Sequence, residues 1–112
     1  MGWFGGAVLQ TYGSVPGDYE VITVSTTAVG LSAAKIRPTT GPFKGLSAQA
    51  ALISLEGGDV RFRLDGVAPT STNGHSLGSG DTLVLNGTQS LLNLRAIRKG
   101  TTDGSLQVTY YY

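Results

Sequence analysis

Asp59-Val60-Arg61-Phe62-Arg63-Leu64-Asp65-Gly66 opens the stretch that decides the fold, which continues to Tyr112. Apolar and charged residues alternate here, so Val60, Phe62 and Leu64 face one side of a strand while Arg61, Arg63 and Asp65 face the other. Three further runs follow between Gly, Asp, Asn and Ser residues: Asp81–Asn86, Leu92–Arg98 and Leu106–Tyr112. Alternation with period two, interrupted by turn residues, is typical of an antiparallel sheet.

The residues before this stretch predict more strands. Tyr19–Ala28 is rich in Val, Ile and Thr with period two, which favours a strand. Ser32–Arg37 is expected to form a short strand ended by Pro38, because proline cannot donate to a sheet ladder. Leu46–Leu55 contains helix-favouring Ala and Leu, but it leads into the hairpin-like Glu56-Gly57-Gly58-Asp59 and is therefore predicted to be a strand.

The second half of the chain is divided by a long loop. Gly66–Gly80 is predicted to be a polar loop of about fifteen residues, longer than most connections in a compact domain, and so a candidate contact segment. Ser90–Arg98 is predicted to be one strand with Leu92, Leu94 and Ala96 on one face.

The last strand carries three consecutive tyrosines. Tyr110 and Tyr112 continue the face of Leu106 and Val108 and are expected in the core or an interface, whereas Tyr111 is expected on the opposite face.

These observations predict an all-β, single-domain antiparallel β-sandwich or jelly roll of about seven to eight short strands. The length of 112 residues fits one domain. Residues 1–17 are Gly-rich and are predicted to form an N-terminal arm or peripheral strand, with the β-sandwich domain at 18–112. Trp3 and Phe4 of the arm either fold back on their own domain or dock on a neighbouring subunit.

Composition excludes several classes of protein. The net charge of +1 and the 13% of charged residues give no field to recruit nucleic acid. There are no cysteines for a disulfide framework or thiolate metal sites. No run approaches the roughly 20 apolar residues of a membrane span, and the apolar start of the chain lacks a basic segment. The sequence therefore predicts a soluble protein made in the cytoplasm, without nucleic-acid or membrane partners.

No catalytic constellation is evident. His75 is the one histidine; Ser76 or Ser79 could be drawn into a triad with it, but no nucleophile elbow supports this. A lone His beside Gly in a polar loop is more simply a turn residue. Metal sites, including one of cupin type, lack further ligands. We therefore expect no enzyme activity, no metal and no cofactor.

The second half of the chain carries a family resemblance. The succession comprises Val60–Gly66, Ala68-Pro69-Thr70, Gly74-His75, Gly80–Leu85, Ala96-Ile97-Arg98 and Leu106–Tyr111. It resembles small virion structural proteins of tailed bacteriophages, in particular head-decoration or head-associated β proteins. The resemblance covers about half of the chain and is a pattern of strands and turns; residues 1–55 match only in being β-rich and Thr-rich.

The resemblance implies a non-enzymatic subunit, located in the virion and assembled in the host cytoplasm. It implies a capsid decoration (cement) protein that binds the outer head surface through the major capsid protein, as a homo-oligomer in which a trimer is favoured. Two alternatives stay open: a neck or tail structural protein, and a carbohydrate- or receptor-binding β-sandwich module. The candidate assembly contacts are Trp3, Phe4, Arg61, Arg63, His75 and Tyr111.

Overall fold

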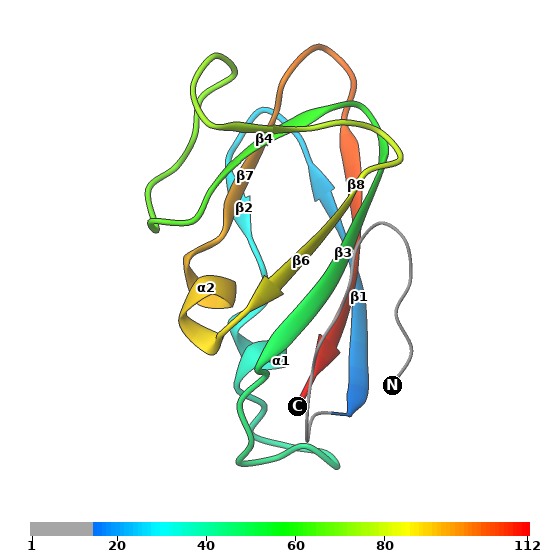
Figure 1. The fold of residues 1–112 in the computed structure, drawn as a ribbon, viewed down its shortest axis with the longest axis vertical. Helices are drawn as coiled ribbons and strands as arrows, with labels where there is room; N and C mark the ends of the chain where they lie inside the picture. Colours follow the sequence, from blue (N-terminus) through cyan, green and yellow to red (C-terminus); the bar gives the residue numbers. More distant parts are fainter. Residues whose placement is uncertain (1–14) are drawn as a thin grey trace.

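The chain folds into two antiparallel sheets of four strands each that pack face to face (Figure 1). The computed structural model describes residues 15–112. The strands are β1 (Pro16–Val24), β2 (Val29–Gly30), β3 (Ala50–Gly57), β4 (Val60–Arg63), β5 (His75–Leu77), β6 (Thr82–Asn86), β7 (Arg95–Arg98) and β8 (Gly104–Tyr111). The first sheet has the order β1-β8-β3-β6 and the second sheet the order β2-β7-β4-β5. The all-β sandwich predicted from the sequence is confirmed.

The strand pairing is that of a jelly roll. β1 pairs with β8, β2 with β7, β3 with β6 and β4 with β5, all antiparallel. The second half of the chain therefore runs antiparallel to the first half, like one long hairpin whose paired strands are folded into the two sheets of the sandwich. Of the predicted arm at residues 1–17, the structure describes 15–17. Pro16 and Gly17 begin β1, and Val15 exchanges two backbone hydrogen bonds of 2.9 Å with Tyr112.

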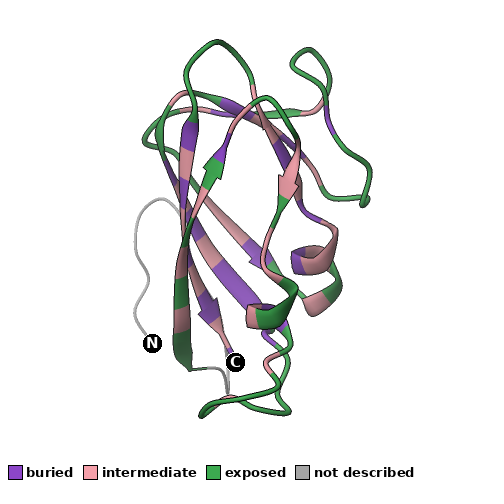
Figure 2. Ribbon diagram, turned by 180° about the vertical axis from the view of Figure 1, so that it is seen from behind, coloured by how far each residue is buried: buried purple, intermediate pink, exposed green. Residues whose placement is uncertain are grey.

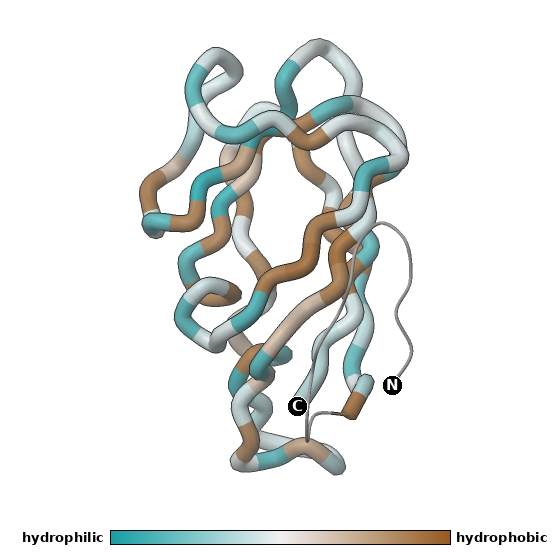
Figure 3. Tube along the Cα trace, in the orientation of Figure 1, coloured by the Kyte–Doolittle hydropathy of each residue, from teal (hydrophilic) through white to brown (hydrophobic). Residues whose placement is uncertain are grey.

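Alternating burial along the strands builds the core (Figure 2). In β8 every second residue is buried, namely Gly104, Leu106, Val108 and Tyr110. Tyr112 is also buried, so the predicted placement of Tyr110 and Tyr112 on the core face is confirmed. The middle of β6 is hydrophobic, β4 alternates between hydrophobic and hydrophilic residues, and β7 has two hydrophobic residues between two arginines (Figure 3).

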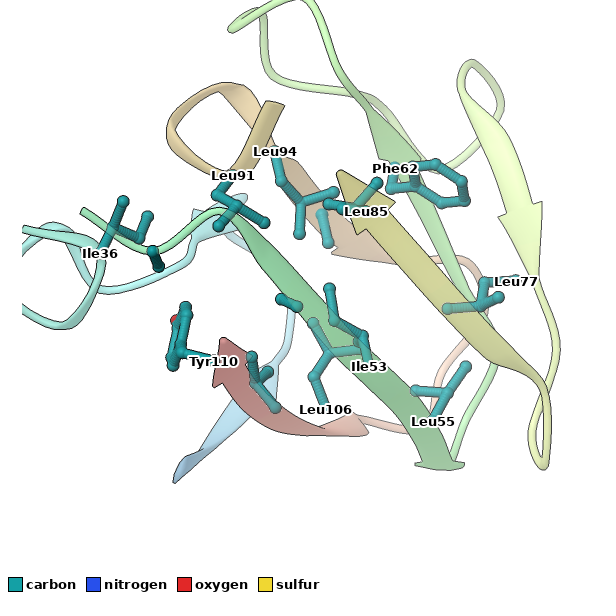
Figure 4. Packing of buried hydrophobic residues seen from close by; sticks show 14 of the residues in the cluster. Ile36, Ile53, Leu55, Phe62, Leu77, Leu85, Leu91, Leu94, Leu106 and Tyr110 are labelled. Atoms are coloured by element: carbon teal, nitrogen blue, oxygen red, sulfur yellow. The ribbon is translucent and has the colours of Figure 1, made fainter. Parts of the chain in front are cut away.

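Large side chains from both sheets meet between the layers (Figure 4). They include Ile53, Leu55 and Leu106 from the first sheet and Val60, Phe62 and Leu77 from the second. A gap of about 10 Å³ lies among them, which is too small to admit a ligand. This part of the interior is packed core and does not form a binding cavity.

Two short helices replace strands that the sequence predicted. The strand predicted at Ser32–Arg37 is wrong, because α1 (Ala33–Ile36) lies there and sends Ile36 fully into the core. The single strand predicted at Ser90–Arg98 is also wrong in its first half, where α2 (Thr88–Asn93) precedes β7. Leu91 and Leu94, three positions apart, are the buried residues at this junction, and that spacing is helical.

Two further boundaries differ from the prediction. The strand predicted at Tyr19–Ala28 ends at Val24, after which the chain bends into β2. The predicted loop Gly66–Gly80 contains β5, whose three residues pair with Val60, Arg61 and Phe62. β5 is short and flanked by Gly and Ser, so its own pattern is too brief to reveal it; β4 supplies the ladder that makes it a strand.

Hydroxyl groups of the two buried tyrosines tie α1 to the first sheet. The Tyr110 hydroxyl donates to the carboxylate of Glu20, which also accepts the backbone N–H of Ser32 at 3.2 Å. The Tyr112 hydroxyl donates to the backbone carbonyl of Lys35. The pKa of Tyr110 is raised well above its ordinary value, mainly because the hydroxyl is buried and secondly because it bonds the Glu20 carboxylate. Both hydroxyls therefore stay protonated and act as donors at neutral pH.

Candidate assembly surfaces

The outer face of the second sheet carries the arginines singled out from the sequence. Val60 and Phe62 are buried in β4, while Arg61 and Arg63, which alternate with them, are half-buried and point away from the core. The predicted alternation is thus confirmed for Val60–Arg63, whereas Leu64, predicted on the core face, follows the strand and is 37% exposed. Across the ladder, Arg61 lies opposite Ile97 and Arg63 opposite Arg95.

Arg61 holds the loop between β4 and β5 against the sheet. Its Nε donates to the Ser71 carbonyl and its Nη1 to the Gly74 carbonyl, both at 2.9 Å. Thr70 and Asn73 close a turn in the same loop. Gly74 is needed there, because its φ is +138° and an added Cβ would come within 3.0 Å of Pro69. This part of the loop therefore has a defined shape beside β4.

Arg63 pairs with a carboxylate two positions along the chain. Its Nε donates to Oδ1 of Asp65 at 3.0 Å, and Nη2 bonds the second carboxylate oxygen. The pKa of Asp65 is held below its ordinary value, mainly by this hydrogen bond from the guanidinium. Both groups are thus charged at neutral pH.

Arg95 and Lys99 join the same face. Arg95 alternates with buried Ala96, its carbon chain lies over Gly30 of β2, and its Nη2 is 3.4 Å from the Ala28 carbonyl. Lys99 follows β7, and its Nζ bonds the Ser76 hydroxyl at 3.2 Å. We call Arg61, Arg63, Arg95 and Lys99 the basic face. The sequence shows these residues as two small clusters; antiparallel pairing of β4 with β7 brings the clusters together.

His75 opens β5 as an exposed residue, so its interpretation as a turn residue is wrong. Its ring packs on Phe62 with the centroids 5.3 Å apart and the planes tilted by 39°. Two aspartates near β5 bind backbone in turns: Asp59 accepts the Ser79 N–H at 2.9 Å and Asp81 the Gly78 N–H at 2.8 Å. Within residues 15–112, no group of His, Cys, Asp and Glu side chains could hold a metal ion.

Tyr111 lies on the first sheet, away from the basic face. It occupies an outward position of β8, half-buried, in register with Ala50 of β3, and its predicted separation from the core face is confirmed. Of the six predicted contact residues, Arg61 and Arg63 therefore lie together on the outer face of the second sheet, while His75 lies in the same sheet on the side of Phe62, its register partner. Trp3 and Phe4 lie outside the described residues.

The outer face of the first sheet has a different chemistry. One row of outward residues crosses its four strands in register: Val84, Leu52, Thr109 and Tyr19. Beside this row lies Val21, opposite Gln107; Tyr19 and Val21 are each 52% exposed. We call these residues the Tyr19 face. Its outward strand positions are mostly Thr, Ser, Val and Leu, and sequence reasoning missed it because the prediction aligned no strands side by side.

Comparison with models of known protein families, with curated proteins and with solved structures finds no significant match in any of the three. None of the helices within residues 15–112 is long and apolar enough to cross a membrane.

Proposed function

We propose that the chain is a non-enzymatic structural protein of a tailed-phage virion, a decoration protein that binds the outer head surface as a homo-oligomer. The observation that carries the proposal is a packed jelly roll with two opposite, chemically different outer faces. Jelly rolls serve both as capsid domains and as lectins. A small subunit with two distinct faces can contact the shell with one surface and its own copies with another, and symmetry then multiplies modest contacts.

The disposition of the aromatic rings favours the assembly role over the carbohydrate-binding one. Tyr110 and Tyr112 are buried, and Phe43 stacks on Tyr112 with centroids 4.4 Å apart. Tyr19 is the large aromatic residue that is most exposed within residues 15–112. A sugar platform uses two or three exposed rings on one surface, whereas a half-exposed Tyr beside Val and Leu suits a protein interface.

The test uses capsid shells of the phage whose genome encodes the chain, purified without it. We expect the chain to co-sediment with the shells, to occupy symmetric outer positions in electron micrographs, and to sediment alone as an oligomer of the 11.6 kDa subunit. Binding to the neck or tail instead would establish the first alternative. A monomer that ignores both and binds a glycan array would establish the second and overturn the proposal.

A further inference from the structure

We propose that the basic face binds a carboxylate-rich patch on a protein surface; as the contact with the capsid, this inference rests on the proposed function. The charge balance is the first reason. The face holds four cations, with Asp59 and Asp65 at the two ends of β4, and so has a net charge of +2. The whole chain has a net charge of +1, so the remainder sums to −1. Positive charge is thus concentrated on this sheet.

The second reason is an unbalanced pair within the ladder. Arg63 lies directly opposite Arg95, and like charges at such positions, about 5 Å apart at Cβ, destabilise a sheet. Asp65 compensates Arg63. Within residues 15–112, no ion pair joins Arg95 or Lys99 to a carboxylate. In the isolated chain the repulsion between Arg63 and Arg95 is therefore only partly compensated, and an anion that binds beside Arg95 would reduce it.

The third reason concerns the kind of anion. A guanidinium presents parallel N–H groups that match the two oxygens of a carboxylate. Ile97 lies opposite Arg61 in the middle of the face, and an apolar residue among arginines is typical of a protein interface. Asp59 and Asp65 would repel a continuous phosphate backbone, and nucleic-acid binding depends on neutralising many phosphates. The face thus fits a local cluster of Asp and Glu side chains.

Two double variants with the same change of charge test the proposal on the shells. R95Q/K99Q removes two cations of the basic face; neither is tied to the loop, as Arg61 is. R37Q/K44Q removes two exposed cations elsewhere and is the matched control. At about 0.15 M salt we expect R95Q/K99Q to bind at least about tenfold more weakly, and R37Q/K44Q to stay within about twofold. Circular dichroism and thermal melting verify that both variants fold.

Equal binding of both variants to shells that bind the wild type would overturn this inference and leave the proposed function intact. If the wild type does not bind shells, the proposed function fails. The inference is then tested separately, by titrating the protein with a hexaglutamate peptide. Backbone amide resonances at positions 63, 95 and 99 should then shift on titration in the wild type and not in R95Q/K99Q. Their failure to shift, or tighter binding of a twelve-base-pair DNA duplex through the same residues, would overturn the carboxylate assignment.

Discussion

The two sheets of this jelly roll differ in length and in what they present outward. The first sheet contains strands of nine, eight, eight and five residues, whereas those of the second have two, four, four and three. Long strands bring continuous ladders and most of the paired backbone. The outer side of the first sheet is the Tyr19 face, and that of the second is the basic face.

This difference assigns separate tasks to the sheets. The first sheet has long ladders, with one register shift between Pro16 and Tyr19 of β1, and the alternating buried residues of β8, so it should supply most of the stability. The second sheet has shorter ladders, and its outward arginines and lysine add polar contacts, such as the Arg61 bonds to the loop, more than apolar burial. Stability measurements on matched substitutions in the two sheets can break or sharpen this division.

The largest effect is expected for Leu106→Ala in β8, at the centre of the first sheet. Leu106 is 2% exposed and packs between the layers, so truncation should lower the free energy of unfolding by about 3 kcal/mol through lost burial and a cavity. The matched variant, Leu77→Ala, lies on β5 at the edge of the second sheet. It should cost roughly 1 kcal/mol less, because an edge strand can relax into the space. Urea unfolding measures both; a larger loss for Leu77→Ala would contradict the division.

A smaller loss is expected for Gly58→Ala, at the connection between the sheets. A Cβ at Gly58 would lie 2.1 Å from the Thr102 carbonyl oxygen, whereas one at Gly100 meets nothing within 4 Å. The Gly58 N–H also donates to the Asp103 carbonyl at 2.9 Å. We expect Gly58→Ala to cost about 1–3 kcal/mol through overpacking, and Gly100→Ala to stay within about 0.5 kcal/mol. Similar thermal unfolding midpoints for the two variants would contradict the prediction, because they would show that the backbone at Gly58 can move away from Thr102 at little cost.

Tyr110→Phe should cost about 1–2 kcal/mol at neutral pH, because it removes the hydrogen bond from the hydroxyl to Glu20. Its alkaline behaviour is more specific. The raised pKa means that the folded chain keeps a proton which an unfolded tyrosine loses near pH 10. The contribution is therefore complete below pH 10, and above it stability falls by up to about 1.4 kcal/mol per pH unit.

Urea titrations between pH 8 and 11.5 should show a shallower decline for Tyr110→Phe than for the wild type. Tyr112→Phe is the comparison: because burial also raises the pKa of Tyr112, the stability of this variant should also decline less steeply with pH than that of the wild type. Parallel curves for Tyr110→Phe and the wild type would mean that the Tyr110 proton is not linked to folding.

The smallest effect on stability is expected for Arg95→Gln. The substitution removes the repulsion between Arg63 and Arg95, so the free energy of unfolding should stay within about 0.5 kcal/mol of the wild type, with any change toward higher stability. Arg61→Gln is the comparison, because loss of its two bonds to the loop should cost about 1 kcal/mol. Chemical denaturation at low salt measures both, and a loss above 1 kcal/mol for Arg95→Gln would give Arg95 a structural task.

Sequence reasoning predicted the fold class and those strands whose alternation is long or strongly β-branched. β8 and β6 fall in this group. The strand at Leu46–Leu55, which begins at Ala50, was instead predicted from the hairpin-like connection that follows it. Sequence reasoning failed at α1 and α2, where tertiary contacts select a helical turn: one buried residue, Ile36, anchors α1 in the core. It also failed at β5, which exists because β4 offers it a partner.

The candidate surfaces were harder to predict from the sequence than the fold. The alternation in β4 correctly placed Arg61 and Arg63 outward. The addition of Arg95 depended on knowing that β7 lies beside β4, and the row from Val84 to Tyr19 depended on the order of four strands. Such pairings join residues far apart in the chain, and the pattern within each strand carries no information about its neighbour.

The pairing of β1 with β8 also determines when β1 can find its partner strand during synthesis. Its uninterrupted part joins residues 80–90 positions apart, from Val24 with Gly104 to Tyr19 with Thr109. A ribosome adding about 5–20 residues per second needs roughly 4–18 s to make that interval. During this time the β-branched run from Val21 to Val24 has no partner strand, and such runs are prone to aggregate. The yield of folded protein should therefore depend on what shields β1 until β8 emerges.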